Sequence, residues 1–489
     1  MSDLKSYKSY KSYRAYMALA LLLCAAVAAA QAPKREMRGA WLHTVYQEQY
    51  LRSTTADNQA RLRRQLDSLQ AAGVNAVIFQ VRPQADAFYD SKLEPWSCYL
   101  TRDGRAPRPA WDPLAFMVAE CHARGMELHA WLNPYRVTAG ARQVPAAGHL
   151  YHKHPERFVR YGGKLYFDPG LPANREHICR VVADIVDRYD VDGIHFDDYF
   201  YPYPVKGKDF PDDKSYARHG RGMKRADWRR ANVDSLIAGV HRTIRTSRRP
   251  WVRFGVSPFG IWRNATSDPR GSATSGLENY DGLYADVLLW AQQGWVDYLM
   301  PQLYWELDHK AAAYRTLVDW WADNACGRHV YVGQDAGRTM RAGELSAKMA
   351  MQRRRPELQG HCWWPGYTLC RNEGGVADSL ALTHQRARAL VPSYPWIASE
   401  GPWPVADVSA RGRHIAWSAP EPEGAVEDAV RFVVYRFDRP DAIDLNDATA
   451  IVAVTPRREH EAAAPGWYVV TALDRANNES APSNPVRCR

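Results

Sequence analysis

Val191-Asp-Gly-Ile-His-Phe-Asp-Asp198 is a short apolar run that ends in two acids, and it is the part of the sequence from which the fold is most readily inferred. Side chains of a β-strand alternate between its faces, so Ile194 and Phe196 share one face while His195 and Asp197 share the other. An apolar face suits packing beneath helices, and a polar face suits the mouth of a barrel. We therefore predict a strand whose carboxyl end carries functional side chains.

Seven similar stretches accompany this one, and helix-like stretches separate them. The predicted strands cover residues 38–44, 75–82, 127–134, 191–198, 252–258, 296–304, 329–333 and 360–364, and the last predicted helix covers 377–390. Alternating strand–helix units predict an α/β fold, a (β/α)8 TIM barrel over residues 35–390. The alternative is an open doubly wound sheet, but no glycine-rich fingerprint follows any of the predicted strands.

The pattern changes after the predicted barrel. Residues 391–404 are rich in Pro, Trp and Ser and are interpreted as a linker. Residues 405–487 contain short alternating strands separated by turn residues, which predicts a small all-β, immunoglobulin-like sandwich. The order of its motifs, from Trp417 to Tyr468, resembles a fibronectin type III domain with Tyr468 as the corner tyrosine. No ionisable cluster stands out there, so we expect a spacer or docking module.

The N-terminus resembles a secretory leader. Residues 1–30 combine a basic start with a short apolar run that ends in small residues, which predicts a signal peptide and an exported protein of the periplasm or cell envelope. Leu23 precedes Cys24, where a lipoprotein signal has a smaller residue, so cleavage near Ala30 is favoured over a lipid anchor. The full chain has a net charge of +10, part of which belongs to the leader.

Composition narrows the class of protein. The 489 residues are 46% hydrophobic and 24% charged, which excludes collagen, coiled coil and bulk disorder. No apolar run beyond the N-terminus is long enough to span a bilayer, so we expect no integral membrane segment. The 18 Trp and 27 Tyr against 12 Phe suit either a surface that binds sugars or a large Trp-rich core, and composition alone does not favour one over the other. We expect a polysaccharide partner, no nucleic acid, and no cofactor or metal.

Active sites of these barrels lie at the carboxyl ends of the strands, so polar and aromatic residues there are the candidates. Cleavage of a glycosidic bond needs one carboxyl group to protonate the leaving oxygen and a second to attack or to activate water. Asp197 and Glu306 are the predicted pair, and Asp198 could replace or assist either. The predicted substrate-binding residues are Trp41, His43, Gln80, Arg82, Asn133, His195, Tyr199, Gln302, Tyr304, Trp305, Gln334, Asp335, Trp363 and Trp364.

Five motifs in order carry a family resemblance: Arg38-Gly-Ala-Trp-Leu-His43, Phe79-Gln-Val-Arg-Pro83, His129-Ala-Trp-Leu-Asn-Pro-Tyr-Arg136, Asp192-Gly-Ile-His-Phe-Asp-Asp-Tyr199 and Met300-Pro-Gln-Leu-Tyr-Trp-Glu306. Together they resemble the bacterial glycosyl-hydrolase-like family ten. The resemblance implies an N-acetylhexosamine-containing cell-wall glycan as substrate, such as peptidoglycan strands that lack stem peptides. Asp197 also lies where the α-amylase and α-galactosidase superfamilies have a nucleophile, which implies Asp197 as nucleophile or base and Glu306 as acid.

Two other functions stay open at this point. One is a non-catalytic glycan-binding protein on a degenerate barrel. The other is a metal-dependent deacetylase or other hydrolase, for which His43, His129 and His195 would have to converge. Whether a glycosidase would retain or invert configuration depends on the separation of the carboxyl groups, which the sequence leaves open together with the oligomeric state.

Overall fold

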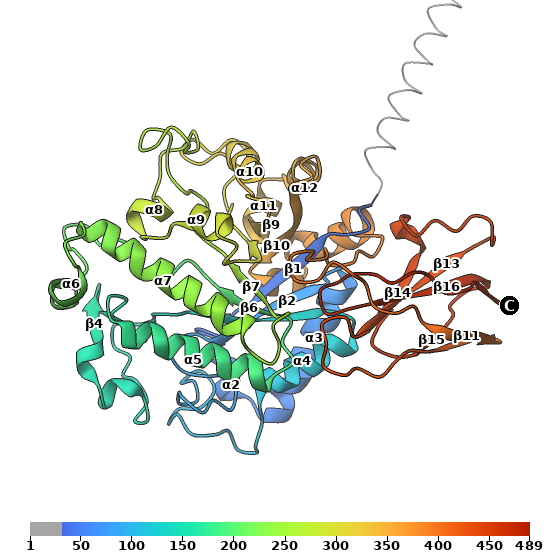
Figure 1. The fold of residues 1–489 in the computed structure, drawn as a ribbon, viewed down its shortest axis with the longest axis horizontal. Coiled ribbons are helices and arrows are strands. Elements are labelled where there is room, and N and C mark those ends of the chain that lie inside the picture. Colours follow the sequence, from blue (N-terminus) through green and yellow to red (C-terminus); the bar gives the residue numbers. More distant parts are fainter. Residues whose placement is uncertain (1–31) are drawn as a thin grey trace, which may run out of the picture.

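A closed barrel of parallel strands forms the larger part of the chain (Figure 1). The computed structural model describes residues 32–489, so the predicted leader and Cys24 lie outside the described residues. The strands follow one another around the barrel as β1-β10-β9-β8-β7-β6-β3-β2, and neighbours are parallel. Their bounds are β1 Met37–Leu42, β2 Ala76–Arg82, β3 Glu127–Leu132, β6 Gly193–Phe196, β7 Arg253–Val256, β8 Tyr298–Leu299, β9 His329–Asp335 and β10 Leu358–Trp364. The predicted barrel is confirmed, and the open sheet was the wrong alternative.

Helices surround this barrel and supply the connections between its strands. The main ones are α3 Thr55–Ala71, α4 Pro113–Ala123, α5 Pro172–Arg188, α7 Arg225–Arg245, α9 Val287–Gln292, α10 Tyr314–Asp323 and α12 Leu345–Arg353. The other α-helices are α2 Gln49–Arg52, α6 Asp213–His219, α8 Asn279–Gly282, α11 Ala336–Arg341, α13 Gly366–Cys370 and α14 Val376–Ser379. A hairpin of β4 Phe158–Tyr161 and β5 Lys164–Phe167 lies after β3. No helix of residues 32–489 has both the length and the apolar character needed to cross a membrane.

The sixth strand and the last helix differ most from their predicted bounds. The sixth strand is regular only at Tyr298–Leu299, because Pro301 has no N–H to donate to the sheet, and pairing resumes at a single position, Gln302. The helix predicted at 377–390 ends at His384 after one wide turn. The chain then runs extended, and Leu390 pairs with Arg35 beside the start of the barrel.

Strand alternation sorts the buried side chains into two layers. Val77, Phe79 and Val332 belong to the large apolar core shared with the helices. A second cluster fills the inside of the barrel and consists of Met37, Trp41, Ala76, Ile78, Trp131, Tyr298, Met300, Tyr331 and Cys362, with Val391 and Tyr394. The segment 391–404, predicted as a linker, therefore begins with side chains that close the lower end of the barrel.

The C-terminal unit consists of two antiparallel sheets. One has the order β11-β12-β15 and the other β14-β13-β16-β17, with bounds β11 Ala406–Arg411, β12 His414–Ser418, β13 Arg431–Phe437, β14 Ile451–Thr455, β15 Glu459–Glu461, β16 Gly466–Leu473 and β17 Val486–Cys488. The Tyr468 hydroxyl donates to the carbonyl of Ala464, 2.6 Å away. The fibronectin type III resemblance and the exact domain boundaries stay predictions.

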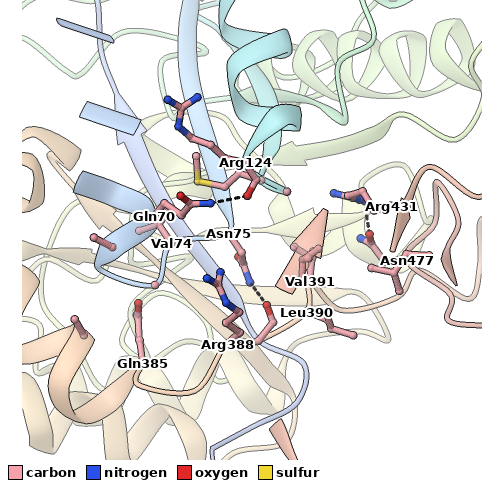
Figure 2. Close-up of a pocket in the computed structure, with 18 of the residues that line it drawn as sticks. Gln70, Val74, Asn75, Arg124, Gln385, Arg388, Leu390, Val391, Arg431 and Asn477 are labelled. Carbon is pink, nitrogen blue, oxygen red and sulfur yellow. Dashed lines mark hydrogen bonds between the residues drawn. The ribbon is translucent and has the colours of Figure 1, made fainter. Parts of the chain in front are cut away.

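The C-terminal unit contacts the amino-terminal ends of the barrel strands, opposite the expected active-site end. Arg431 of β13 and Asn477 both bind Glu127, the first residue of β3. A cavity of about 230 Å³ lies in this seam, with residues of the barrel on one side and Arg431, Leu473 and Asn477 on the other (Figure 2). The two units are thus joined by buried polar contacts at the base of the barrel.

Candidate functional site

A pocket of about 330 Å³ lies at the carboxyl ends of the barrel strands. Strands β1, β2, β3 and β10 contribute to its wall, together with the segments that follow β3, β6, β7 and β8. The lining residues are Trp41, His43, Val45, Tyr46, Gln80, Trp131, Arg136, Asp197, Asp198, Tyr199, Ser257, Gln302, Tyr304 and Trp364. Aromatic rings around a pair of acids give a surface that can stack on sugar rings and exchange protons with them.

Asp197 is the most perturbed acid of this pocket. Its side chain is 3% exposed and accepts hydrogen bonds from the Trp131 indole (3.3 Å), from the Asn133 amide, and from the Tyr199 backbone (3.3 Å). Burial, followed by the neighbouring Asp198 carboxylate, raises the pKa of Asp197 to about 7. A carboxyl group with this pKa can both donate and accept a proton near neutral pH.

Asp198 lines the same pocket although it is the next residue in the chain. Strand β6 ends at Phe196, so the alternation of faces no longer applies beyond it and both acids face the cavity. Asp198 accepts a hydrogen bond from the Tyr203 hydroxyl, and burial raises its pKa. Two buried carboxyl groups this close oppose each other's ionisation, so the pair holds a proton more tightly than isolated acids do.

Glu306, the other predicted catalytic acid, lies elsewhere. It lines a separate, open pocket with His309, Arg338 and Arg341, and its carboxylate is 3.7 Å from the Arg338 guanidinium. The irregular backbone after β8 explains this placement, because a strand alternation counted from residue 296 does not extend to residue 306. The structure therefore brings Asp197 together with Asp198 and not with Glu306.

The predicted binding residues divide into three groups. Those that line the pocket are Trp41, His43, Gln80, Tyr199, Gln302, Tyr304 and Trp364. Two lie directly behind its wall: Asn133 accepts from Gln80 and donates to Asp197, and His195 receives the Trp41 indole N–H at 3.2 Å. The remaining five, Arg82, Trp305, Gln334, Asp335 and Trp363, do not line it.

Local contacts account for those five. Arg82 forms a buried two-armed ion pair with Glu94, and Asp335 accepts from the backbone of Arg338 at the start of α11. Cys362 faces the inside of the barrel, so the next residue, Trp363, faces outward and belongs to the outer core. Gly333 also faces inward, since a Cβ there would touch the Trp41 ring, and so the next residue, Gln334, faces outward. The Trp305 ring packs edge-on against Phe259.

Sequence reasoning missed Trp131, Arg136, Ser257, Tyr46 and Val45 as lining residues. Trp131 could have been found, because it shares the inward face of its strand with His129. Arg136 packs over the Tyr199 ring, 5.1 Å from its centre, and its buried Nη2 has no hydrogen-bond partner. Arg136 also lines the pocket that holds the two carboxyl groups, where its guanidinium can donate to an oxygen of a bound sugar.

The three histidines considered as metal ligands do not converge. His129 and His195 both bond to the Tyr298 hydroxyl, while His43 packs against Trp364 and Tyr367. Across residues 32–489 no group of three or more His, Cys, Asp or Glu side chains has an arrangement that could hold a metal ion.

Comparison with known proteins identifies relatives of this chain. The family model described as Glycosyl hydrolase-like 10 matches residues 36–348, a range that contains both pocket aspartates. The glycosyl hydrolase YngK of Bacillus subtilis (strain 168) is 39% identical over 386 residues, covering 75% of this chain and 75% of YngK. The glycosyl hydrolase DigH of Escherichia coli (strain K12) is 41% identical over 320 residues, covering 60% of this chain and 72% of DigH.

Among solved structures, the glycoside hydrolase domain of PgaB (BpsB) from Bordetella bronchiseptica is similar to this chain at low sequence identity. It covers 71% of this chain and 99% of that domain, with 13% identity and a TM-score of 0.44.

Proposed function

This chain belongs to the glycosyl hydrolase-like 10 family, and from that premise we propose that it is a glycoside hydrolase that cleaves O-glycosidic bonds in a polysaccharide. One observation carries the proposal: a buried carboxyl group, Asp197, with a pKa of about 7, lies beside a second carboxyl group in an aromatic pocket at the catalytic end of the barrel. Near neutral pH such a group can protonate a leaving glycosidic oxygen.

In the proposed reaction, Asp197 gives its proton to the glycosidic oxygen as the bond from that oxygen to the anomeric carbon breaks. Water then adds to the anomeric carbon and gives a proton back to Asp197. Asp198 raises the pKa of Asp197 through its negative charge and stabilises positive charge that develops on the sugar. Trp41, Tyr304 and Trp364 provide flat faces for the sugar rings. Glu306, in the separate pocket beside Arg338, is the partner that the sequence predicted for Asp197, with Glu306 as the acid.

For the substrate we propose a bacterial cell-wall-type polysaccharide, namely peptidoglycan glycan strands, acted on in the periplasm or cell envelope. The motif resemblance and the leader predicted at residues 1–30 support this. Arg136 supports it as well, because it lines the pocket and its guanidinium can donate hydrogen bonds to an acetamido carbonyl or a sugar carboxylate.

Cleavage of purified glycan strands tests the proposal. Strands with and without stem peptides are incubated with the protein, and the products are identified by mass spectrometry. We expect new reducing ends from strands without stem peptides, and a rate about 10²- to 10⁴-fold lower for Asp197→Asn. Asp308→Asn is the matched control, because Asp308 is an exposed acid whose partner is Arg315 and it lies outside the pocket.

The same experiment decides between an enzyme and a non-catalytic glycan-binding protein. Strands that bind to the wild-type protein without any release of reducing ends would rule out the hydrolase and leave the binding function. Release that persists unchanged in Asp197→Asn would remove Asp197 from the proposed role.

A further inference from the structure

Beneath the pocket, a chain of buried polar side chains runs down the inside of the barrel. The Tyr298 hydroxyl lies 3.0 Å from Nδ1 of His195 and 2.8 Å from Nδ1 of His129. Nε2 of His129 lies 3.1 Å from Oε2 of Glu127, at the amino-terminal start of β3. At the upper end, Nε2 of His195 lies 3.2 Å from the Trp41 indole nitrogen and 3.1 Å from the Ser257 hydroxyl.

The barrel strands leave room for these rings. A side-chain carbon at Gly193 would lie 2.5 Å from the His129 ring, and one at Gly255 would lie 2.1 Å from the Tyr298 ring. Both distances are far below contact, so these two inward-facing positions must lack a side chain for the chain of hydrogen bonds to form.

Only one set of hydrogen positions satisfies the whole chain. The Trp41 indole can only donate, so Nε2 of His195 accepts and the His195 proton is on Nδ1. Nδ1–H of His195 donates to the Tyr298 oxygen, and the Tyr298 hydroxyl then donates to Nδ1 of His129. His129 therefore carries its proton on Nε2 and donates it to the carboxylate of Glu127.

At the base of the barrel, contacts with the C-terminal unit help to fix which oxygen of the Glu127 carboxylate faces His129. Oε1 is 2.5 Å from the Arg253 guanidinium, and it accepts from Arg431 at 3.1 Å and from the Asn477 amide at 2.9 Å. Figure 2 shows Arg431 and Asn477 joined to each other; this hydrogen bond, 2.6 Å long, orients the Asn477 amide so that its nitrogen points to Glu127. Since these three groups occupy Oε1, Oε2 is left for His129.

We propose that Glu127, His129 and Tyr298 are positioning residues that set the tautomer of His195, and that Arg431 and Asn477 of the C-terminal unit orient Glu127 for this purpose. The result is a His195 Nε2 whose single lone pair is shared by the Trp41 indole N–H and the Ser257 hydroxyl, which holds both groups in the wall of the pocket. The inference rests on the proposed function only in that the pocket is where the glycan reacts.

Glu127→Gln tests the proposal sharply. Donor groups surround Oε1, so the amide oxygen must take that place and the amide NH₂ must face Nε2 of His129. Every hydrogen bond of the chain then reverses, His195 becomes protonated on Nε2, and the Trp41 indole N–H faces another donor. We expect both histidines to change tautomer and kcat to fall at least about tenfold through misplaced pocket residues.

The tautomers are read by NMR of protein labelled with ¹⁵N-histidine, without substrate, and His129→Asn and His195→Asn variants assign the signals. The expected result is Nδ1–H for His195 in the wild type and Nε2–H in Glu127→Gln. A wild-type His195 protonated on Nε2, or a folded Glu127→Gln protein with unchanged tautomers, would overturn the proposal. Because this measurement needs no substrate, a protein that cleaves no glycan would refute the proposed function and still test this inference.

Tyr298→Phe provides a second variant if Glu127→Gln does not fold. It removes only the central hydroxyl, so His195 is expected to lose its single tautomer. Tyr331→Phe is its matched control, since Tyr331 is an equally buried tyrosine inside the barrel whose hydroxyl bonds to Tyr394 instead. An unchanged His195 in Tyr298→Phe, or the same change in Tyr331→Phe, would contradict the proposed chain.

Discussion

At the residue scale, the pocket depends on two neighbouring carboxyl groups whose ionisations are linked. Asp197 and Asp198 are both 3% exposed, and each pKa is raised chiefly by burial. The negative charge of Asp198 raises the pKa of Asp197 further. Proton donation by Asp197 therefore depends on Asp198, although Asp198 need not transfer the proton itself.

Asp198→Asn is expected to shift the pH profile. Removing the negative neighbour lowers the pKa of Asp197 from about 7 toward the ordinary carboxyl range. Since the proposed role requires protonated Asp197, the decline of kcat/KM with rising pH begins at a lower pH, and the rate at neutral pH falls. A pH–rate profile measures this, and a decline at the wild-type pH would contradict the link between the two acids.

Glu306→Gln separates the two candidate carboxyl pairs. Glu306 is half-exposed beside Arg338, outside the pocket of Asp197, so we expect kcat to fall less than about tenfold. Measurement of kcat on the same glycan as Asp197→Asn decides the matter. A loss as large as that of Asp197→Asn would restore Asp197 and Glu306 as the acting pair.

At the element scale, the alternation of strand faces identifies most of the inner wall but fails where a strand is irregular. It correctly places His195 and Trp131 inside the barrel and would place Trp363 outside. It fails for Arg82, because the register of β2 shifts between Gln80 and Arg82 and the guanidinium turns toward Glu94. Such a bulge depends on contacts with distant residues, so local sequence does not reveal it.

Arg82→Met is expected to affect stability first. Arg82 is fully buried and pairs with Glu94, which also bonds to His177, so the variant leaves a buried carboxylate without its main partner. We expect the free energy of unfolding to fall by about 3 kcal/mol. Urea denaturation measures it; a protein of wild-type stability that has lost glycan affinity would show that Arg82 binds substrate.

At the scale of the whole molecule, the barrel and the C-terminal unit share buried charges. Arg253 of the barrel and Arg431 of the C-terminal unit both face Glu127. Burial by itself would raise the pKa of Glu127, but Arg253, His129 and Arg431 outweigh this effect. The pKa of Glu127 therefore lies well below its usual range. Tyr394 from the connecting segment bonds to Tyr331 inside the barrel. The C-terminal unit therefore completes the base of the barrel.

Arg431→Met tests this shared base. Glu127 keeps Arg253 and Asn477, so we expect a loss of about 2 kcal/mol in the free energy of unfolding, smaller than for a fully unpaired charge. Arg436→Met is the control, because Arg436 lies on the same strand and pairs with the exposed Asp438. Equal stability of the two variants in urea denaturation would mean that the contact with Glu127 does not join the units.

Periodicity and motifs are local properties of the chain, so the sequence was enough to predict the order of strands and helices, the closed barrel and the family. It also identified Asp197 and much of the aromatic wall. Only the tertiary structure decided that Asp198 and not Glu306 shares the pocket, that Arg136 lines it, and that Glu127 meets the C-terminal unit. These relations join residues that are far apart in the chain or lie on irregular backbone, where strand alternation no longer says which way a side chain points.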